Sequence, residues 1–173
     1  IYELSHVGKI PSKMPIQIPF SFAAIIIQVV LDVDKAIELL KKLKHIPKDA
    51  EKHDLKELIE RLKFAENWVK EFAPEQYVFK INEKVPDDVK AKIEPKQLEC
   101  LFKVKAYLKE HDEVDEKLLY DQFYNIARSV DINPAELFRA AYYVLIGKEK
   151  GPKLANFIVT LGKEKVIELI EQL

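Results

Sequence analysis

The stretch from Leu137 to Ile170 constrains the fold most, because its glycines divide it into three short helices. Asn133-Pro134 suits the cap and first position of one helix, and Gly147 suits the left-handed residue after its end. Gly151-Pro152 restarts the chain, since proline is tolerated at a helix start but not in its interior. Gly162 then ends the second helix. Short helices joined by tight corners predict a compact all-α domain.

Apolar residues at helical spacing predict helices along most of the remaining chain. The expected helices cover about 21–31, 32–45, 54–73, 94–110 and 118–130, with one further helical turn at 85–92. Residues 1–19 are rich in proline and read as an extended connector. The predicted fold is all-α, a helical bundle or cage in two packed halves. We expect the first half to cover residues 1–93, including the connector, and the second to cover residues 94–173.

The composition bears on the cellular compartment in which the protein is found. Cys100 is the only cysteine, which predicts no internal disulfide and a reducing compartment. No apolar run is long enough to cross a bilayer and no signal peptide is visible, so we expect a cytoplasmic location. Lysine and glutamate dominate the charges, a bias typical of hyperthermophile proteins. The chain begins at Ile1 without methionine, which we interpret as a piece of a longer protein.

Charge bears on possible nucleic-acid binding. The formal net charge is −1, whereas a protein that binds nucleic acid through bulk electrostatics is basic. Residues 35–48 and 90–109 each carry a local excess of lysine. Any phosphate contact must therefore be local, and most of these lysines are expected to lie on solvated helix faces.

Signatures of catalysis are missing from the sequence. The four histidines lack the spacing of a zinc site, and the four glycines form no phosphate-binding loop. Cys100 lies on an amphipathic helix, which favours packing over nucleophilic chemistry. We therefore expect no catalytic residue, no metal and no cofactor in this chain.

The Gly-Pro corner leaves a helix N-terminus and its free amides facing a small hollow. Phe138, Tyr142 and Tyr143 lie on the preceding helix and are placed to line this hollow. Free amides and aromatic rings suit an anion or an unpaired nucleic-acid base. The alternative is that this is an ordinary tight corner and the aromatic residues belong to the core.

The same residues carry a family resemblance. Gly147, Gly151-Pro152, Leu154 and the run 161–164 (LGKE) resemble the C-terminal anticodon-binding motif of glutamyl- and class I lysyl-tRNA synthetases. Residues 1–22 (IYELSHVGKIPSKMPIQIPFSF) and 67–79 (NWVKEFAPEQYVF) resemble class I lysyl-tRNA synthetases of archaeal type much more than the glutamyl enzymes.

This resemblance implies that the chain is the tRNA-binding C-terminal region of a class I lysine–tRNA ligase. Its partners would be the anticodon loop of lysine tRNA and the catalytic domain of the parent chain. Residues 1–93 would resemble a stem-contact subdomain, and residues 94–173 would form the anticodon-binding cage. The expected RNA-binding residues are Phe138, Arg139, Tyr142, Gly151, Pro152 and Leu154. The glutamyl family tends to have a basic residue where this chain has Tyr142.

Class I synthetases use HIGH- and KMSKS-type signatures, and this sequence has neither. We therefore expect the chain to be inactive alone, with ATP and Mg²⁺ bound by the parent. Two alternatives remain open from the sequence. One is the anticodon-binding region of a glutamyl-type synthetase, and the other is a helical protein–protein interaction module.

Overall fold

A computed structural model describes residues 15–51 and 53–173 of the chain. The described residues form α-helices and one short 3₁₀ turn, with no strand among them, so the all-α prediction is confirmed. The chain divides into two compact units, Ile1–Glu71 and Phe72–Leu173. Most of the predicted N-terminal connector, residues 1–14, lies outside the described residues; residues 15–19 carry no helix or strand.

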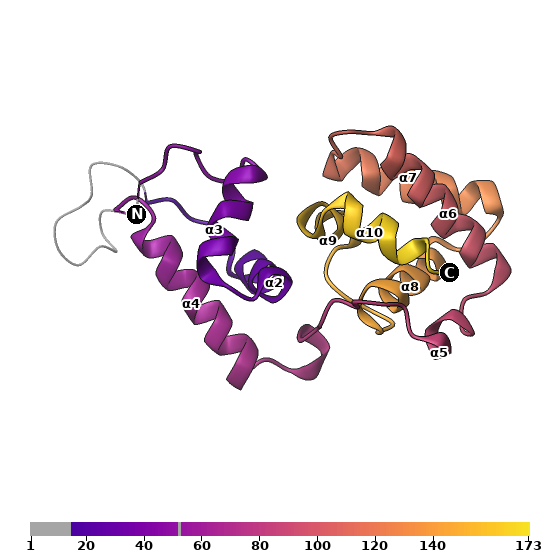
Figure 1. Cartoon of the computed structure of the whole chain (residues 1–173), viewed down its shortest axis with the longest axis horizontal. Coiled ribbons are helices and arrows are strands. Elements are labelled where there is room, and N and C mark those ends of the chain that lie inside the picture. The colour runs from indigo at the N-terminus through magenta and orange to yellow at the C-terminus, as the bar shows by residue number, and fades with distance from the viewer. Residues whose placement is uncertain (1–14, 52) are drawn as a thin grey trace. The chain divides into compact units, whose positions relative to one another are not determined.

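The first unit is built around a central apolar helix. Its helices are α2 (Phe20–Val30), α3 (Val33–Lys42) and α4 (Lys56–Glu71). α2 packs against both α3 and α4 (Figure 1), and its Ala23 and Ile26 are fully buried. Gln28 is also buried, and its side-chain amide donates to the carbonyl of Ala24 at 2.8 Å. The segment expected to be helical at about 21–31 is apolar on nearly every side, and the helix that it forms lies at the centre of its unit.

The ends of these helices follow the sequence in part. The sequence offers Asp32 or Asp34 as the start of the helix expected from about residue 32, and the structure selects Asp32, whose carboxylate caps α3 by accepting from the backbone N–H of Lys35 at 2.9 Å. On the helix expected at about 54–73, apolar residues at helical spacing predict an inner face that includes Phe72, and that assignment is wrong. α4 ends at Glu71 and the Phe72 side chain is 70% exposed, because the residue that follows the helix no longer continues its apolar stripe.

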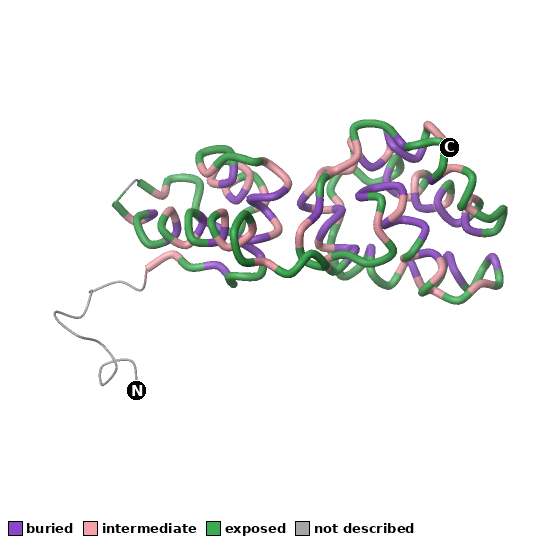
Figure 2. Tube along the Cα trace, turned by 90° about the horizontal axis from the view of Figure 1, so that it is seen from below, coloured by how far each residue is buried: buried purple, intermediate pink, exposed green. Residues whose placement is uncertain are grey.

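The second unit holds the remaining elements. They are the 3₁₀ turn η1 (Glu75–Tyr77) and the helices α5 (Asp87–Lys90), α6 (Pro95–Glu110), α7 (Glu116–Val130), α8 (Pro134–Ile146), α9 (Leu154–Leu161) and α10 (Lys163–Ile170). α6 packs against α7, α8 and α10, while α7 also packs against α8 and α9. Buried and exposed stretches alternate along these helices (Figure 2), as expected for amphipathic helices around a shared core.

The division between the units lies about twenty residues before the boundary predicted near residue 93. Residues 72–86, here called the connecting segment, belong to the second unit and are hydrogen-bonded to the rest of it. The backbone N–H of Asn82 donates to the carbonyl of Leu145 at 2.8 Å, and that of Val85 donates to the side chain of Gln172 at 2.9 Å. These contacts join residues far apart in the chain, and the local proline and charge content on which the boundary prediction rests does not indicate them.

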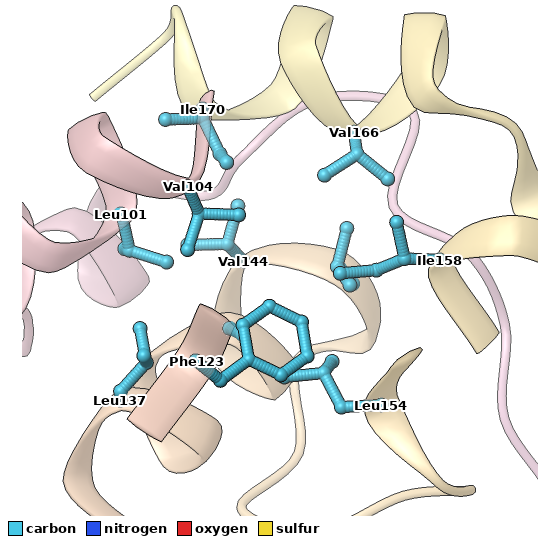
Figure 3. Close-up of a pocket in the computed structure, with 11 residues that line it drawn as sticks. Leu101, Val104, Phe123, Leu137, Val144, Leu154, Ile158, Val166 and Ile170 are labelled. Atoms are coloured by element: carbon cyan, nitrogen blue, oxygen red, sulfur yellow. The ribbon is translucent and has the colours of Figure 1, made fainter. Parts of the chain in front are cut away.

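The core of the second unit is filled by apolar side chains from five helices. Figure 3 shows Phe123, Leu154 and Ile158 gathered around a void of about 10 Å³. A void of this size holds at most one water molecule, so it is a packing defect and not a ligand site. Cys100 is fully buried nearby on α6, and burial raises the pKa of its thiol, which agrees with a packing role.

Candidate functional site

The corner between α8 and α9 forms largely as the sequence predicts. The Asn133 side chain caps α8 by accepting from the backbone N–H of Ala135 at 2.9 Å, and Gly147 ends the helix with a left-handed φ of 68°. Pro152 differs from its predicted place at the start of the next helix. α9 begins at Leu154, and Pro152 lies within the corner, where its carbonyl oxygen accepts a hydrogen bond.

Tyr142 on α8 supplies that hydrogen bond and braces the corner. Its hydroxyl donates to the Pro152 carbonyl, and its side chain is 9% exposed. A Cβ added at Gly151 would lie 2.8 Å from Cε1 of the Tyr142 ring, so the ring packs directly against the glycine backbone. Burial raises the pKa of Tyr142 to about 12. Three of the predicted site residues therefore form one structural unit.

A hollow of about 690 Å³ lies beside this corner. It is bounded by α7, by α8 and by the start of α9, and its lining residues are Asp115, Glu116, Lys117, Tyr120, Phe123, Tyr124, Phe138, Tyr142, Lys153, Leu154 and Ala155. The volume falls within the range of ordinary ligand sites, roughly 300–1,000 Å³.

The predicted site residues divide between the hollow and its surroundings. Phe138, Tyr142 and Leu154 line the hollow, whereas Arg139, Gly151 and Pro152 are not among its lining residues. Tyr143, also expected to line it, is instead hydrogen-bonded through its hydroxyl to the Glu149 carboxylate at 2.7 Å. Whether any of the predicted residues contacts RNA stays a prediction.

One wall of the hollow is aromatic. This aromatic wall consists of Tyr120 and Tyr124 of α7 and Phe138 of α8. The ring centroids of Tyr120 and Tyr124 are 5.0 Å apart, and the two hydroxyls are hydrogen-bonded to each other at 2.8 Å. The Phe138 ring packs edge-on against Tyr124, with ring centroids 5.9 Å apart, and against the buried Phe123, with ring centroids 5.8 Å apart. The rings thus run as a connected series from the core to the surface.

Sequence reasoning did not identify the two tyrosines of this wall. A signal was present, because Tyr120 and Tyr124 are four residues apart and share one face of α7. That face lies off the buried stripe, which consists of Leu119, Phe123, Ile126, Ala127 and Val130. An aromatic pair on the exposed side of a helix indicates binding more strongly than one on the buried side.

The rim of the hollow combines two acids with two lysines. Asp115 caps α7 by accepting from the backbone N–H of Leu118 at 2.9 Å. The Glu116 carboxylate accepts from the side-chain amide of Asn156 at 2.9 Å, which ties the start of α7 to α9. With Lys117 and Lys153 added, the formal charge of the rim is balanced. A balanced rim suits the polar edge of a neutral ring better than a bare phosphate.

Positive charge lies on the neighbouring face of α8. Arg139 is exposed. The hydrogen bond to Glu149 raises the pKa of the Tyr143 hydroxyl, and the charges of Lys92 and Arg139 oppose this shift in part. Lys92 Nζ lies 5.9 Å from the Tyr143 ring centroid. Lys150 is exposed in the corner itself. We call Lys92, Arg139 and Lys150 the positive flank; Lys92 also forms an ion pair with Asp88 at 3.0 Å, so Arg139 and Lys150 supply most of its charge.

Within the described residues, no group of three or more His, Cys, Asp or Glu side chains is placed to hold a metal ion. The helices of the same described part are all too short or too polar to cross a membrane.

Comparison with known proteins places this geometry in a family. Residues 24–173 match the family described as "Anticodon binding domain". The chain is 34% identical over 168 residues to the lysine–tRNA ligase of Pyrococcus horikoshii, a match covering 96% of this chain and 31% of that protein. It is 32% identical over 167 residues to the lysine–tRNA ligase of Borreliella burgdorferi, covering 95% of this chain and 30% of that protein.

A third relative, the lysine–tRNA ligase of Methanocaldococcus jannaschii, is 34% identical over 176 residues. This match covers 96% of the present chain and 32% of the relative, so the chain spans about a third of the length of the curated relatives it matches. The family match covers residues 24–71 of the first unit and all of the second, including the α8–α9 corner and the hollow beside it. The chain belongs to the anticodon binding domain family.

Proposed function

We propose that this chain is the tRNA-binding region of a class I lysine–tRNA ligase and that it recognises the anticodon loop of lysine tRNA. The observation that carries the proposal is the hollow beside the α8–α9 corner, in a chain of the anticodon binding domain family. The relatives named above are lysine–tRNA ligases, which favours lysine over the glutamyl alternative.

The chemistry of the hollow supports an unpaired base as its ligand. Sequence-specific RNA recognition targets unpaired bases, which stack on aromatic side chains and form hydrogen bonds through their edges. The hollow offers aromatic rings on one wall and polar groups of both charges at its rim. Phe138 and Leu154 contribute apolar surface, while Tyr142 with Gly151 and Pro152 keeps the corner in place.

The positive flank gives the RNA backbone a local contact. Because the whole chain carries a formal net charge of −1, phosphates are attracted only where lysine and arginine gather. Arg139 is the residue of the flank best suited to a phosphate, since its planar guanidinium donates two parallel hydrogen bonds. We assign the flank to backbone positioning and the hollow to base recognition.

In the parent enzyme this binding would serve selection. Contacts to a distant loop help to place the acceptor end of the tRNA in the catalytic domain, so remote binding energy favours the productive complex. We assign ATP and Mg²⁺ to that catalytic domain, and we expect no lysyl-adenylate from this chain in a pyrophosphate-exchange assay. Pyrophosphate exchange above a buffer control would contradict the assignment of ATP binding to the catalytic domain alone.

Titration of the chain with lysine tRNA and with glutamate tRNA, stepped through salt, tests the proposal. We expect tighter binding of lysine tRNA at every salt concentration, with a shallow salt dependence because few phosphates are neutralised. Preference for glutamate tRNA would support the glutamyl alternative. Binding that is lost above low salt and is equal for both tRNAs would contradict specific recognition and favour a protein–protein module.

A further inference from the structure

We propose that Tyr120 and Tyr124 form the stacking surface for one unpaired base of the anticodon loop, and that this base is a uracil. The inference rests on the proposed function and deepens it, because it assigns the base to the α7 wall of the hollow. The residues expected from the sequence lie instead on α8, in the α8–α9 corner and at the start of α9.

The exposure of Tyr120 is the first argument. Its side chain is 48% exposed although it lies in a hollow bounded by three helices. The buried stripe of α7 begins next to it at Leu119, which is fully buried. The core therefore does not use the Tyr120 ring, and its face is available to a ligand on the hollow side.

The fixed orientation of the pair is the second argument. The hydroxyls of Tyr120 and Tyr124 are hydrogen-bonded at 2.8 Å, and Tyr124 packs edge-on against Phe138, which in turn meets the buried Phe123. Each ring in this series restricts the next. A surface that is already ordered loses little conformational entropy when a base stacks on it.

The polar groups at the rim of the hollow are the third argument, because their donors and acceptors determine which base edge they can bind. Asp115 and Glu116 each use one carboxylate oxygen within the protein, so the second oxygen of each is available to accept from a ligand. Among the described residues, Lys117 and Lys153 have no ion-pair partner within 4.0 Å, and both lie at the same rim.

Carboxylate and ammonium together match uracil. Its pairing edge presents one N–H donor between two carbonyl acceptors, so a carboxylate accepts from N3–H while a lysine donates to a neighbouring carbonyl. Cytosine places an acceptor at that central position, which a carboxylate would repel. Lysine codons begin with two adenines, so a lysine anticodon carries the required uracils.

Binding of the lysine anticodon stem–loop to the whole chain tests the stacking surface. We expect Tyr120→Leu, which keeps apolar bulk but removes the ring, to weaken binding about ten- to a hundredfold. Tyr120→Phe keeps the ring and should stay within about threefold. Tyr77→Leu is the matched control, because Tyr77 is 56% exposed in the same unit but is absent from the lining of the hollow; its affinity should be unchanged.

A photochemical map supplies a second readout that needs no variant. 5-Iodouridine placed at each uridine of the loop in turn should cross-link to the peptide carrying Tyr120 and Tyr124 at one position only. If the wild-type chain discriminates between anticodons but cross-links elsewhere, and Tyr120→Leu binds normally, the inference is overturned while the proposed function stands. If the wild-type chain does not discriminate at all, it is the proposed function that fails.

Discussion

Tyr142 connects the α8–α9 corner to the core through both parts of its side chain. The hydroxyl is bonded to the Pro152 carbonyl and the ring is packed on Gly151. The sequence places these three residues together through the family resemblance, and the structure shows a physical reason for their association. A base contact from Tyr142 itself stays a prediction, since the side chain is 9% exposed.

The pH dependence of unfolding in alkaline solution measures how much the buried hydroxyl of Tyr142 contributes to stability. Burial raises the pKa of Tyr142 to about 12, whereas an unfolded tyrosine titrates near 10. The stabilisation is therefore complete below pH ~10 and is lost as pH rises toward ~12. We expect the free energy of unfolding to fall by up to about 2–3 kcal/mol more in the wild type than in Tyr142→Phe across this range. Parallel urea midpoints for the two proteins would contradict the assignment.

Gly151→Ala tests the packing of the same ring. The added Cβ would lie 2.8 Å from Cε1 of Tyr142 and 3.0 Å from Cδ1 of Ile146, and the tyrosine cannot move away without losing its bond to Pro152. We expect a loss of about 1–3 kcal/mol, typical of overpacking, measured by thermal melting. Lys150→Ala alters the exposed neighbour and should leave the melting temperature unchanged. A raised melting temperature in Gly151→Ala would show that the corner has room for a side chain.

At the scale of elements, the sequence predicts helix ends well where a cap is local. α6 begins at the predicted Glu94-Pro95 step, where Glu94 and Gln97 form a reciprocal capping box. The inner faces predicted from apolar spacing are less accurate: on the helices expected at 94–110 and 118–130, that spacing assigns Leu101, Phe102, Leu108 and Leu118 to the core. Leu101 and Leu108 are buried as expected, but Phe102 is 39% exposed and Leu118 is 61% exposed. An apolar residue at the edge of a stripe fits either face, and only the packing of neighbouring helices decides.

The position of the connecting segment also depends on tertiary packing that local sequence does not indicate. Nothing near residue 82 in the sequence indicates that Asn82 reaches the end of α8. Its side-chain amide donates to the carbonyls of Tyr143 at 3.2 Å and Val144 at 2.9 Å. The Tyr143 carbonyl also accepts from the backbone N–H of Gly147, so the amide matters most for Val144, in the last turn of the helix, where carbonyls lack intrahelical partners. Pairing across sixty residues depends on tertiary structure, so the unit boundary could not be derived from local pattern.

Asn82→Ala measures how firmly the connecting segment is held. Removing the amide leaves both carbonyls without this donor, and we expect a loss of about 1–3 kcal/mol in the free energy of unfolding. Glu83→Ala is the control, because its exposed side chain neighbours Asn82 in the chain. Equal urea midpoints for Asn82→Ala and Glu83→Ala would mean that residues 72–86 are held by other contacts.

At the scale of the whole molecule, we propose that tRNA recognition is concentrated at the hollow and not spread over a basic surface. The sequence predicts this from the net charge of −1. Many lysines are engaged within the protein: Lys109, for example, forms an ion pair with Glu171 and lowers the pKa of that carboxyl. If the proposed function holds, specific groups at the hollow account for the affinity for tRNA, and changing the anticodon bases should matter more than adding phosphates.

A competition between two RNAs tests this central claim most directly. The chain is bound to labelled lysine tRNA and displaced either by unlabelled lysine tRNA or by the same tRNA with only its anticodon nucleotides substituted. Both competitors carry the same phosphates, so any difference reports base recognition. We expect the substituted tRNA to compete about tenfold or more weakly, as the loss of one or two base-edge hydrogen bonds requires. Equal competition by the two tRNAs would contradict anticodon recognition by this chain.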